Sequence, residues 1–495
     1  MFIIKLKGEK VVLKFNKRLS KLLACLALCT AVSVGAIGCS SAKDESKNAK
    51  ATMVVNNEKT SSTVETKIDG DKIFVSLKGT TEYFKGNFKL DGKTATVKIG
   101  NDTITVKADS KEATVNSEKL ELKENSKSSD EDIYVPIEFL NDSIDARFTY
   151  NKEGKNLSIK TEMPLKYTKA FSVKYLKGGL KKVVDGDKRT LILVPEGKEV
   201  PKEYKNETII KTPVKKVLLG STTQGCLLRA IDELPSVCAT TSDASTWTIE
   251  EIKKGMEDKK IEFVGKSSAP DYEKISTIKP DLAVVYSGPA GETKLIDKLK
   301  ELKINYVVDN EYLEEDPFGR MEWVKLMSAF YDKEEAAEKY FEDSIKKVET
   351  ASKSIEGKEK PKVVWASVFK GQVYVPKSDS YVAKMIELAG GDYVFKDKNL
   401  KDTKISLEEL YNEANKADVF IYSSTKDWNP SLEGIVKKSP ILKKLKVVED
   451  KKVWCFHPDY WQSIDKTDEL IEDLMKIFVP GSVKGDVRHY IKYDK

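Results

Sequence analysis

The chain has 495 residues, of which 40% are hydrophobic and 33% charged, with a mean hydropathy of -0.43. This length accommodates about three domains, and the composition excludes both a polytopic membrane protein and a fully disordered chain. The formal charge of +6 arises within residues 1–38, because that segment holds seven basic residues and one acid. The remainder is electrically neutral, so nucleic-acid binding is not expected.

Residues 1–38 have the layout of a secretory signal peptide. A basic start is followed by the apolar run 22–38, which ends in Ala-Ile-Gly directly before Cys39. A retained membrane-spanning helix is the alternative, but such a helix usually needs about 20 apolar residues and this run has 17. The Ala-Ile-Gly-Cys segment resembles a bacterial lipobox, which implies that Cys39 is acylated and becomes the new N-terminus. A diacylated Cys39 would anchor the protein at the outer face of the cell membrane.

Two segments precede the main part of the chain. Residues 39–66 are rich in Ser, Lys, Asn, Thr and Glu, which predicts a flexible tether. Residues 67–160 contain short alternating apolar runs separated by Asp-Gly and Gly-Asn turn signals, which predicts a β-rich domain. Its segments 133–140, 146–151 and 157–159 resemble the stalk domain named after the copper amine oxidase N-terminus. The domain lacks histidine and cysteine, so we interpret it as a spacer or wall-contact domain without copper.

From residue 171 onward, apolar strands alternate with amphipathic helices, which is typical of βα units and parallel sheets. Strands are expected at 214–219, 237–240, 282–286 and 304–308 in a first lobe (171–331), and at 362–369, 419–422 and 453–456 in a second lobe (357–495). Residues 332–356 should form one interlobe helix, capped by Asp332 and roughly 36 Å long. The predicted fold class is α/β, with two Rossmann-like lobes joined by one long backbone helix and preceded by a small β-rich domain. A single helical connection permits little hinge motion.

Several segments of this region resemble the solute-binding protein of an ABC importer of the iron-siderophore and cobalamin type. They are Thr-Pro-Val-Lys-Lys-Val-Leu at 212–218, Asp-Tyr-Glu-Lys-Ile at 271–275 with 278–282, Glu-Trp-Val-Lys-Leu at 322–326, Ala-Lys-Met-Ile-Glu-Leu-Ala-Gly-Gly at 383–391, and Ser-Leu-Glu-Glu-Leu at 406–410 with 417–419. The resemblance implies a class III solute-binding lipoprotein that delivers a ferric siderophore, haem or corrinoid to a permease and its ATPase. It also implies that Glu273 and Glu408, one on each lobe, contact the permease. No catalytic residue and no resident cofactor is implied, and we expect a monomer.

Ligands of open parallel sheets bind beyond the carboxyl ends of the strands, so the loops after the predicted strands should line an interlobe cleft. Hydroxyl and aromatic side chains in these loops suit a large ligand with flat or apolar faces. Alternatively, each tryptophan packs its own loop onto its lobe. Lys370, Lys377 and Lys426 would favour an anionic chelate, although lysine is frequent along the whole chain. The candidate cleft residues are Thr223, Gln224, Trp247, Ser287, Tyr312, Phe369, Lys370, Tyr381, Ser424, Trp428, His457, Tyr460 and Trp461.

Other chemistry has little support in the sequence. Direct binding of a metal ion by the protein is not expected, because His457 and His489 are the only histidines. His457 follows a strand on the cleft side, whereas His489 is expected to be exposed. No nucleophile, zinc-protease or phosphate-loop motif lies between a strand and a helix, which argues against a chelatase- or reductase-like enzyme. A surface adhesin or cell-wall-organising lipoprotein remains an alternative, because the N-terminal domain is unusual for a transport component.

Overall fold

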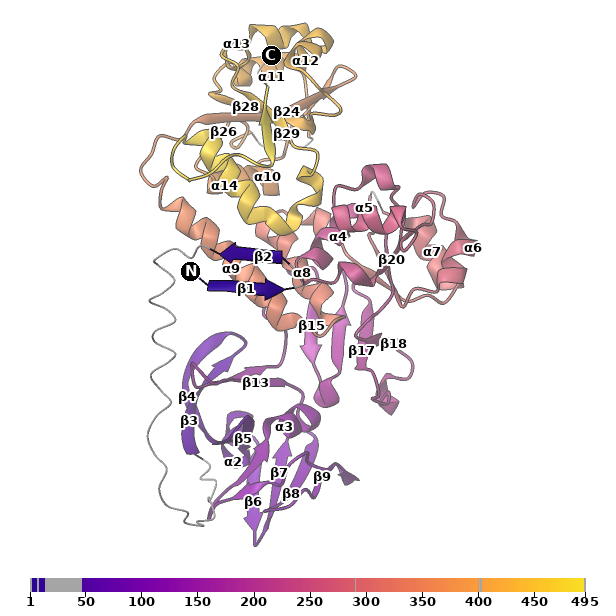
Figure 1. Cartoon of the computed structure of the whole chain (residues 1–495), viewed down its shortest axis with the longest axis vertical. Helices are drawn as coiled ribbons and strands as arrows, with labels where there is room; N and C mark the ends of the chain where they lie inside the picture. The colour runs from indigo at the N-terminus through magenta and orange to yellow at the C-terminus, as the bar shows by residue number, and fades with distance from the viewer. Residues whose placement is uncertain are drawn as a thin grey trace. The chain divides into compact units, whose positions relative to one another are not determined.

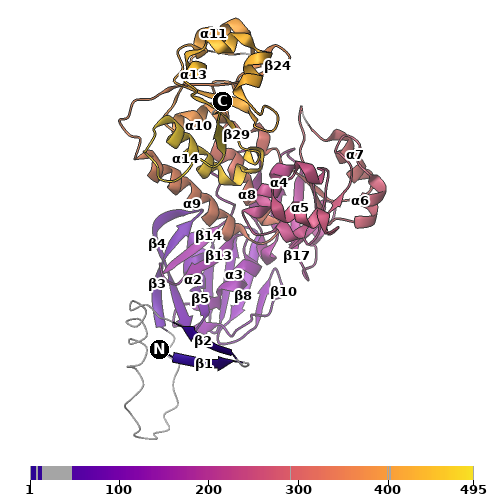
Figure 2. The same cartoon turned by 45° about the horizontal axis from the view of Figure 1, so that its top comes forward.

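The structure is a computed structural model that describes residues 2–6, 9–13, 47–289, 291–398, 400 and 403–493. The strands Phe2–Leu6 (β1) and Glu9–Leu13 (β2) pair antiparallel in a unit separate from the one that begins at Lys47 (Figures 1 and 2). The predicted apolar run 22–38 and the predicted lipidation site Cys39 lie outside the described residues. Among the described residues, no helix is both long and apolar enough to cross a membrane.

The stalk domain begins at Lys47, which corrects the expected tether over 39–66. Lys47–Val55 (β3) and Glu58–Asp69 (β4) pair antiparallel in the middle of a seven-stranded sheet. Threonine and valine recur through both strands and favour a pleated, half-buried surface, with Val64 buried. The polar composition of these strands therefore reflects one solvated face of a sheet.

The other stalk strands complete two sheets. Lys72–Ser76 (β5), Lys127–Ser128 (β11), Ile133–Pro136 (β12), Arg147–Asn151 (β13) and Asn156–Lys160 (β14) belong to the first sheet, whose order is β11-β12-β5-β4-β3-β14-β13. Asn87–Asp91 (β6), Thr94–Ile99 (β7), Asp102–Lys107 (β8), Ala113–Val115 (β9) and Glu118–Lys119 (β10) form a five-stranded antiparallel meander. The short helices are Leu77–Tyr83 (α2) and Ile137–Ser143 (α3). The domain is β-rich, as predicted.

A four-stranded sheet that the sequence analysis did not expect follows the stalk. Its strands are Ser172–Tyr175 (β15), Lys181–Val184 (β16), Thr190–Pro195 (β17) and Thr208–Thr212 (β18), and only β17 and β18 are parallel. The 191–194 run is buried throughout. A short apolar run of this kind does not reveal whether its partner strand is parallel or antiparallel, which is why the region was assigned to the first βα series.

The N-lobe contains a wholly parallel five-stranded sheet. Its strand order is Glu262–Phe263 (β21), Val237–Thr240 (β20), Val217–Leu219 (β19), Leu282–Val285 (β22) and Tyr306–Val308 (β23). The helices are Thr222–Arg229 (α4), Glu250–Glu257 (α5), Tyr272–Ile278 (α6) and Thr293–Glu301 (α7). The four strands predicted for this lobe are present, and the α/β fold class is confirmed.

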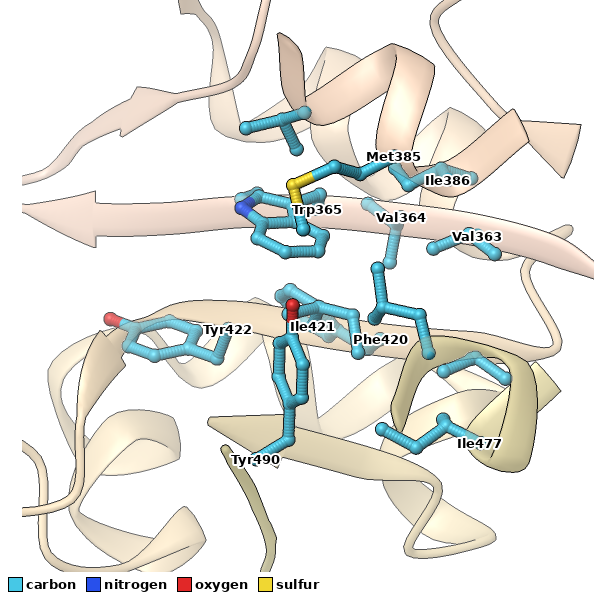
Figure 3. Packing of buried hydrophobic residues seen from close by; sticks show 14 of the residues in the cluster. Val363, Val364, Trp365, Met385, Ile386, Phe420, Ile421, Tyr422, Ile477 and Tyr490 are labelled. Atoms are coloured by element: carbon cyan, nitrogen blue, oxygen red, sulfur yellow. The ribbon is translucent and has the colours of Figure 1, made fainter. Parts of the chain in front are cut away.

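The C-lobe repeats this design with antiparallel additions. Asp392–Tyr393 (β26), Lys362–Phe369 (β24), Val419–Thr425 (β28) and Val453–Phe456 (β29) are parallel, while Gln372–Tyr374 (β25), Lys404–Ile405 (β27) and Tyr490–Lys492 (β30) pair antiparallel. The helices are Tyr381–Leu388 (α10), Leu407–Ala414 (α11), Leu432–Lys438 (α12), Lys446–Glu449 (α13) and Thr467–Phe478 (α14). Figure 3 shows the core of this lobe, where Trp365 of β24 and Ile421 of β28 pack with Met385 of α10 and Tyr490 of β30.

Two helices connect the lobes. Pro317–Ala329 (α8) is buried along nearly its whole length and packs against Glu334–Ser352 (α9). Helix α9 has 19 residues, so it extends roughly 28 Å and is shorter than predicted. Asp332 is not its N-cap, because Asp332 has a positive φ of 57° and its carboxylate pairs with Lys181 instead. Phe341 and Val348 of α9 are buried.

The lobes are also connected directly. Arg229 at the end of α4 donates from Nη2 and Nε to the two carboxylate oxygens of Asp465, over 2.7 and 2.9 Å. Gln462 accepts from the Thr248 N–H at 2.9 Å and donates to the Thr246 carbonyl oxygen at 2.7 Å. A C-lobe segment after β29 therefore binds the N-lobe in addition to the predicted helical connection.

The stalk contacts the start of α9 through buried charges. Arg147 Nη1 donates to Glu334 Oε2 at 2.7 Å, and Lys181 Nζ of β16 lies 2.5 Å from Glu334 Oε1. Glu334 has only 1% of its side chain exposed. One turn further along α9, Lys160 of β14 pairs with Glu338. The stalk is thus joined to the interlobe helix by complementary charge.

Candidate ligand-binding cleft

Two adjoining cavities lie between the lobes, with volumes of about 440 and 290 Å³. Both are lined by Tyr312 of the N-lobe and by Tyr381 and Trp461 of the C-lobe. Cavities of roughly 300–1,000 Å³ are typical of small-molecule sites. The two cavities together form one cleft with walls from both lobes.

The turn after β19 forms part of the N-lobe wall. The Ser221 hydroxyl caps α4, and Gln224 Oε1 accepts from the backbone N–H groups of Gly220 and Ser221, each at 2.9 Å. This capping box satisfies N–H groups at the helix start. The arrangement fixes Thr223 and Gln224 in the first turn of α4, where both line the 290 Å³ cavity.

The floor of the N-lobe side is built from the residues after β23 and from α8. Arg320 donates from Nε and Nη2 to Glu311 Oε2, over 2.8 and 2.7 Å. Burial alone would lower the pKa of Arg320, but the neighbouring Glu311 carboxylate outweighs burial and raises the pKa. Across the cleft, the guanidinium carbon lies 4.4 Å from the centroid of the Tyr381 ring. Arg320 therefore links the two walls.

Asp309 is a carboxyl group of the floor with one oxygen unpartnered among the described residues. It is 2% exposed, and its Oδ1 accepts from the Glu311 N–H at 3.2 Å. Within the described part of the chain, no hydrogen-bond partner reaches its Oδ2. Burial, together with the charge of Glu311, raises the pKa of Asp309 well above its ordinary value. Asp309 therefore offers the cleft a polar atom that no described protein group satisfies.

A second buried acid supports the floor from behind. Burial raises the pKa of Glu292 to about 8. Its Oε2 accepts from the Tyr286 N–H at 3.4 Å and approaches the Gly220 Cα so closely that a Cβ there would lie 2.2 Å from it. A side chain at position 220 would therefore displace the Glu292 carboxylate. The Tyr286 side chain lines the cavity and meets the Tyr312 ring edge-on, with the ring centroids 5.8 Å apart.

Aromatic rings from two elements form the C-lobe wall. Tyr381 is the first residue of α10, and Tyr460 and Trp461 belong to the 3-10 helix Tyr460–Gln462 that follows β29. The Tyr460 ring stacks on Phe456 with centroids 3.8 Å apart, which leaves it 4% exposed. The Trp461 ring lies edge-on to Tyr460 and is 46% exposed. Trp461 therefore presents a partly uncovered indole to the cleft.

Several predicted cleft residues do not line the two cavities. Trp247 is 3% exposed and packs against Gly225, and its Nε1 donates to the Ser242 carbonyl oxygen at 3.3 Å. For Trp247 the structure thus agrees with the alternative that the ring packs its own loop. Phe369 and Trp428 are 59% and 81% exposed but lie outside the cavity linings. Lys370 lies in the β24–β25 turn with its ammonium group over the Phe369 ring.

Other predicted residues contact their own surroundings. The Ser287 hydroxyl donates to Asp187, and the Ser287 carbonyl oxygen accepts from the Tyr312 hydroxyl. Ser424 Oγ accepts from Asn429 Nδ2 at 2.7 Å. Neither serine is among the residues that line the two cavities.

The two histidines share one carboxylate. His457 Nδ1 lies 2.7 Å from Asp459 Oδ1, and His489 Nδ1 lies 3.4 Å from the same oxygen. The prediction that His489 is exposed is wrong, because it is 2% exposed and its Nε2 lies 3.2 Å from Glu469 Oε2. Burial alone would lower the pKa of His489, but the two carboxylates raise it to about 9. Over the described ranges, no three His, Cys, Asp or Glu side chains are grouped to hold a metal ion.

Sequence reasoning missed four residues of the floor. Tyr286, Asp309 and Glu311 come within three residues of the ends of β22 and β23, so the rule that identified the loops also covers them. Arg320 lies on α8 and carried no sequence signal. The predicted docking residues Glu273 and Glu408 are both exposed in the first turns of α6 and α11.

Two family models match this chain, and several solved structures resemble part of it. The family model described as periplasmic binding protein matches residues 227–460, and that of the copper amine oxidase N-terminal domain matches residues 54–159. A solved ABC transporter substrate-binding protein from Listeria monocytogenes covers 54% of this chain and 99% of its own, with TM-score 0.44 and 17% identity. A periplasmic heme-binding protein from Pseudomonas aeruginosa covers 57% and 99%, with TM-score 0.46 and 12% identity.

One relative has a much higher sequence identity to this chain than these two solved structures have. An uncharacterized lipoprotein of Methanocaldococcus jannaschii is 39% identical over 303 residues, which represent 58% of this chain and 71% of the relative. That relative, the matched family model and the two α/β lobes with a cleft between them lead to one assignment: the chain belongs to the periplasmic binding protein family.

Proposed function

We propose that this protein is the substrate-binding component of an ABC importer, and that it captures a bulky nutrient complex in the interlobe cleft. The family supports the general role, because its members are solute-binding proteins rather than enzymes. These binding proteins lie outside the cytoplasm and act with a permease and an ATPase. The ligand classes we propose are ferric siderophores, haem and corrinoids.

The observation that carries this proposal is the cleft with aromatic rings on both walls. The two adjoining cavities of about 440 and 290 Å³ have Tyr286 and Tyr312 on one side and Tyr381, Tyr460 and Trp461 on the other. Aromatic faces bind flat or apolar ligand surfaces, while a few polar groups fix the orientation. A metal complex with an organic periphery offers both kinds of surface.

Delivery requires that the protein stay beside its permease. Acylation of Cys39 would anchor the chain to the outer face of the cell membrane, and the Methanocaldococcus jannaschii relative is itself named a lipoprotein. Glu273 and Glu408 are exposed acids, one on each lobe, and would pair with cationic residues of the permease. Such charge complementarity accelerates and orients docking more than it strengthens it.

The test is a titration of the purified chain with three probes: a ferric trihydroxamate, haem and cyanocobalamin. All six tryptophans lie between residues 247 and 461, so intrinsic fluorescence reports on the solute-binding region alone. We expect saturable quenching by at least one probe at micromolar concentration or below. A protein that ignores all three and sediments with cell-wall polymers would be a surface adhesin, and the proposal would fail.

A further inference from the structure

The two interlobe cavities are lined by more acids than bases. Among the described residues, the carboxyl groups in their walls are those of Asp309, Glu311, Glu314, Glu315 and Asp379, whereas the only Lys or Arg side chains there are Arg320 and Lys377. Lys370 and Lys426 are exposed and do not line either cavity, which removes two of the three lysines that pointed to an anionic ligand. The charge of the cleft thus opposes that sequence-based argument.

The one arginine of the floor already has its partners. Its Nε and Nη2 groups bind Glu311, and its guanidinium stacks on Tyr381. Only 12% of the Arg320 side chain is exposed. An incoming anion would have to compete with the buried Glu311 carboxylate for the guanidinium, and a buried carboxylate that loses its cation is strongly destabilised. Arg320 is therefore a poor receptor for an anionic ligand.

Asp309 has the opposite character. Its Oδ2 is buried beside the cavity and has no partner among the described groups. Leaving a buried polar atom unsatisfied costs free energy, more for a charged group, and a ligand N–H group or cation placed there would recover this free energy. The Oδ1 atom already accepts from the Glu311 N–H, so Oδ2 is the carboxyl oxygen that the described residues leave without a partner.

We infer that the ligand presents N–H donors or positive charge to Asp309 at the N-lobe floor, and that the cleft selects uncharged or cationic metal complexes over polyanionic ones. This inference rests on the proposed function and specifies its ligand class. A complex with carboxamide groups on its periphery offers N–H donors to Asp309 and carries no negative charge there, and its flat face can lie toward Trp461. Complexes rich in carboxylate or catecholate charge place negative charge there instead.

Proton exchange provides an independent readout. Because burial raises the pKa of Asp309, the empty protein retains a proton there more readily than an exposed aspartate does. A bound N–H donor or cation stabilises the ionised form, so binding releases a proton to the buffer and becomes tighter as the pH rises. Calorimetry in two buffers with different ionisation enthalpies measures this release directly.

The test uses two pairs of probes whose members differ by one unit of charge at one group. The first pair is cyanocobalamin and its monocarboxylic acid, in which one peripheral carboxamide is hydrolysed. The second is a linear ferric trihydroxamate with a free terminal ammonium group and its N-acetylated form. We expect the uncharged member of the first pair and the cationic member of the second to bind at least about tenfold more tightly, as for a hydrogen bond to a charged group.

Two variants connect the preference to the residue. Asp309→Asn keeps an oxygen for the Glu311 N–H but places an amide nitrogen at the Oδ2 position, and it should reduce the ratio within each pair to below about threefold and abolish proton release. Asp297→Asn, an exposed acid on α7, should leave the ratios unchanged. Equal or tighter binding of the more negative members by the unaltered protein overturns the inference and leaves the proposed function standing. Failure of all four probes and of haem to bind overturns both.

Discussion

The direct contact between Arg229 and Asp465 provides a sharp test of how the lobes are held together. Both carboxylate oxygens of Asp465 accept from the guanidinium, and Arg229 Nη2 also donates to the Gln462 carbonyl oxygen at 2.9 Å. The Arg229 and Asp465 side chains are 24% and 2% exposed. The substitution Arg229→Met keeps much of the aliphatic volume and removes the charge, which leaves a buried carboxylate with no cation.

The expected loss follows from this burial. Removing one partner of a buried ion pair costs about 3–5 kcal/mol, and the partial exposure of Arg229 places the value near 3 kcal/mol. The reciprocal change Asp465→Leu leaves a guanidinium that can reach water and should cost roughly 1–2 kcal/mol. Replacing both residues removes the unpaired charge, so the double variant should be at least about 2 kcal/mol more stable than the sum of the single losses predicts.

The assay is urea unfolding of the full chain, followed by tryptophan fluorescence. The stalk contains no tryptophan, so the signal reports the two lobes. Asp343→Asn, which breaks an exposed pair with Lys339 on α9, serves as the control and should change the free energy of unfolding by less than about 0.5 kcal/mol. A loss below 1 kcal/mol for Arg229→Met, or additive single losses, would refute the claim that this contact joins the lobes.

Three further predictions concern pH, the ligand and the permease. The pKa of His489 is raised from 6.5 to about 9, so its contribution of roughly 3 kcal/mol to the free energy of unfolding is complete below pH 6.5 and disappears as the pH rises through 9. The thermal unfolding temperatures of wild type and His489→Asn, measured across this range, should therefore converge at the alkaline end. Trp461→Ala should weaken ligand binding by about tenfold or more in a fluorescence titration, whereas Trp428→Ala, outside the cavities, should change it less than twofold. Charge reversal at Glu273 and Glu408 together should preserve ligand affinity but abolish uptake in cells, and normal uptake would contradict the docking role.

The main strands of the two lobes were predictable from the apolar runs in the sequence. The apolar runs at 217–219 and 282–285 form strands that are buried on both faces of a parallel sheet, and the run at 453–456 forms a strand in which only Trp454 is half-buried. The rule that ligands bind beyond strand ends located Thr223, Gln224 and Tyr312, all of which line the cavities. These inferences needed only the order of elements along the chain.

Features that depend on distant partners were not predictable. Arg320 reaches the cleft because α8 packs beneath both lobes, and nothing around residue 320 in the sequence indicates that Glu311 will bind it. His489 looks like an exposed residue near the C-terminus, but strand β30 brings it beside Asp459 and Glu469. The strands β3 and β4 were assigned to a tether because their exposed face is polar. In each case a contact across many residues overrides the local composition.

The connections between the lobes have a consequence for selectivity. Arg229 fixes the Asp465 segment to the N-lobe, and Arg320 lies between Glu311 and Tyr381 on opposite walls of the cleft. A large hinge motion would break both contacts, so the distance between the walls is largely set before a ligand arrives. Binding free energy is then not consumed by closing the lobes, and discrimination depends on the groups already in place. The buried oxygen of Asp309 is one such group, which explains how a single carboxylate in a wide aromatic cleft can determine the charge of the ligand.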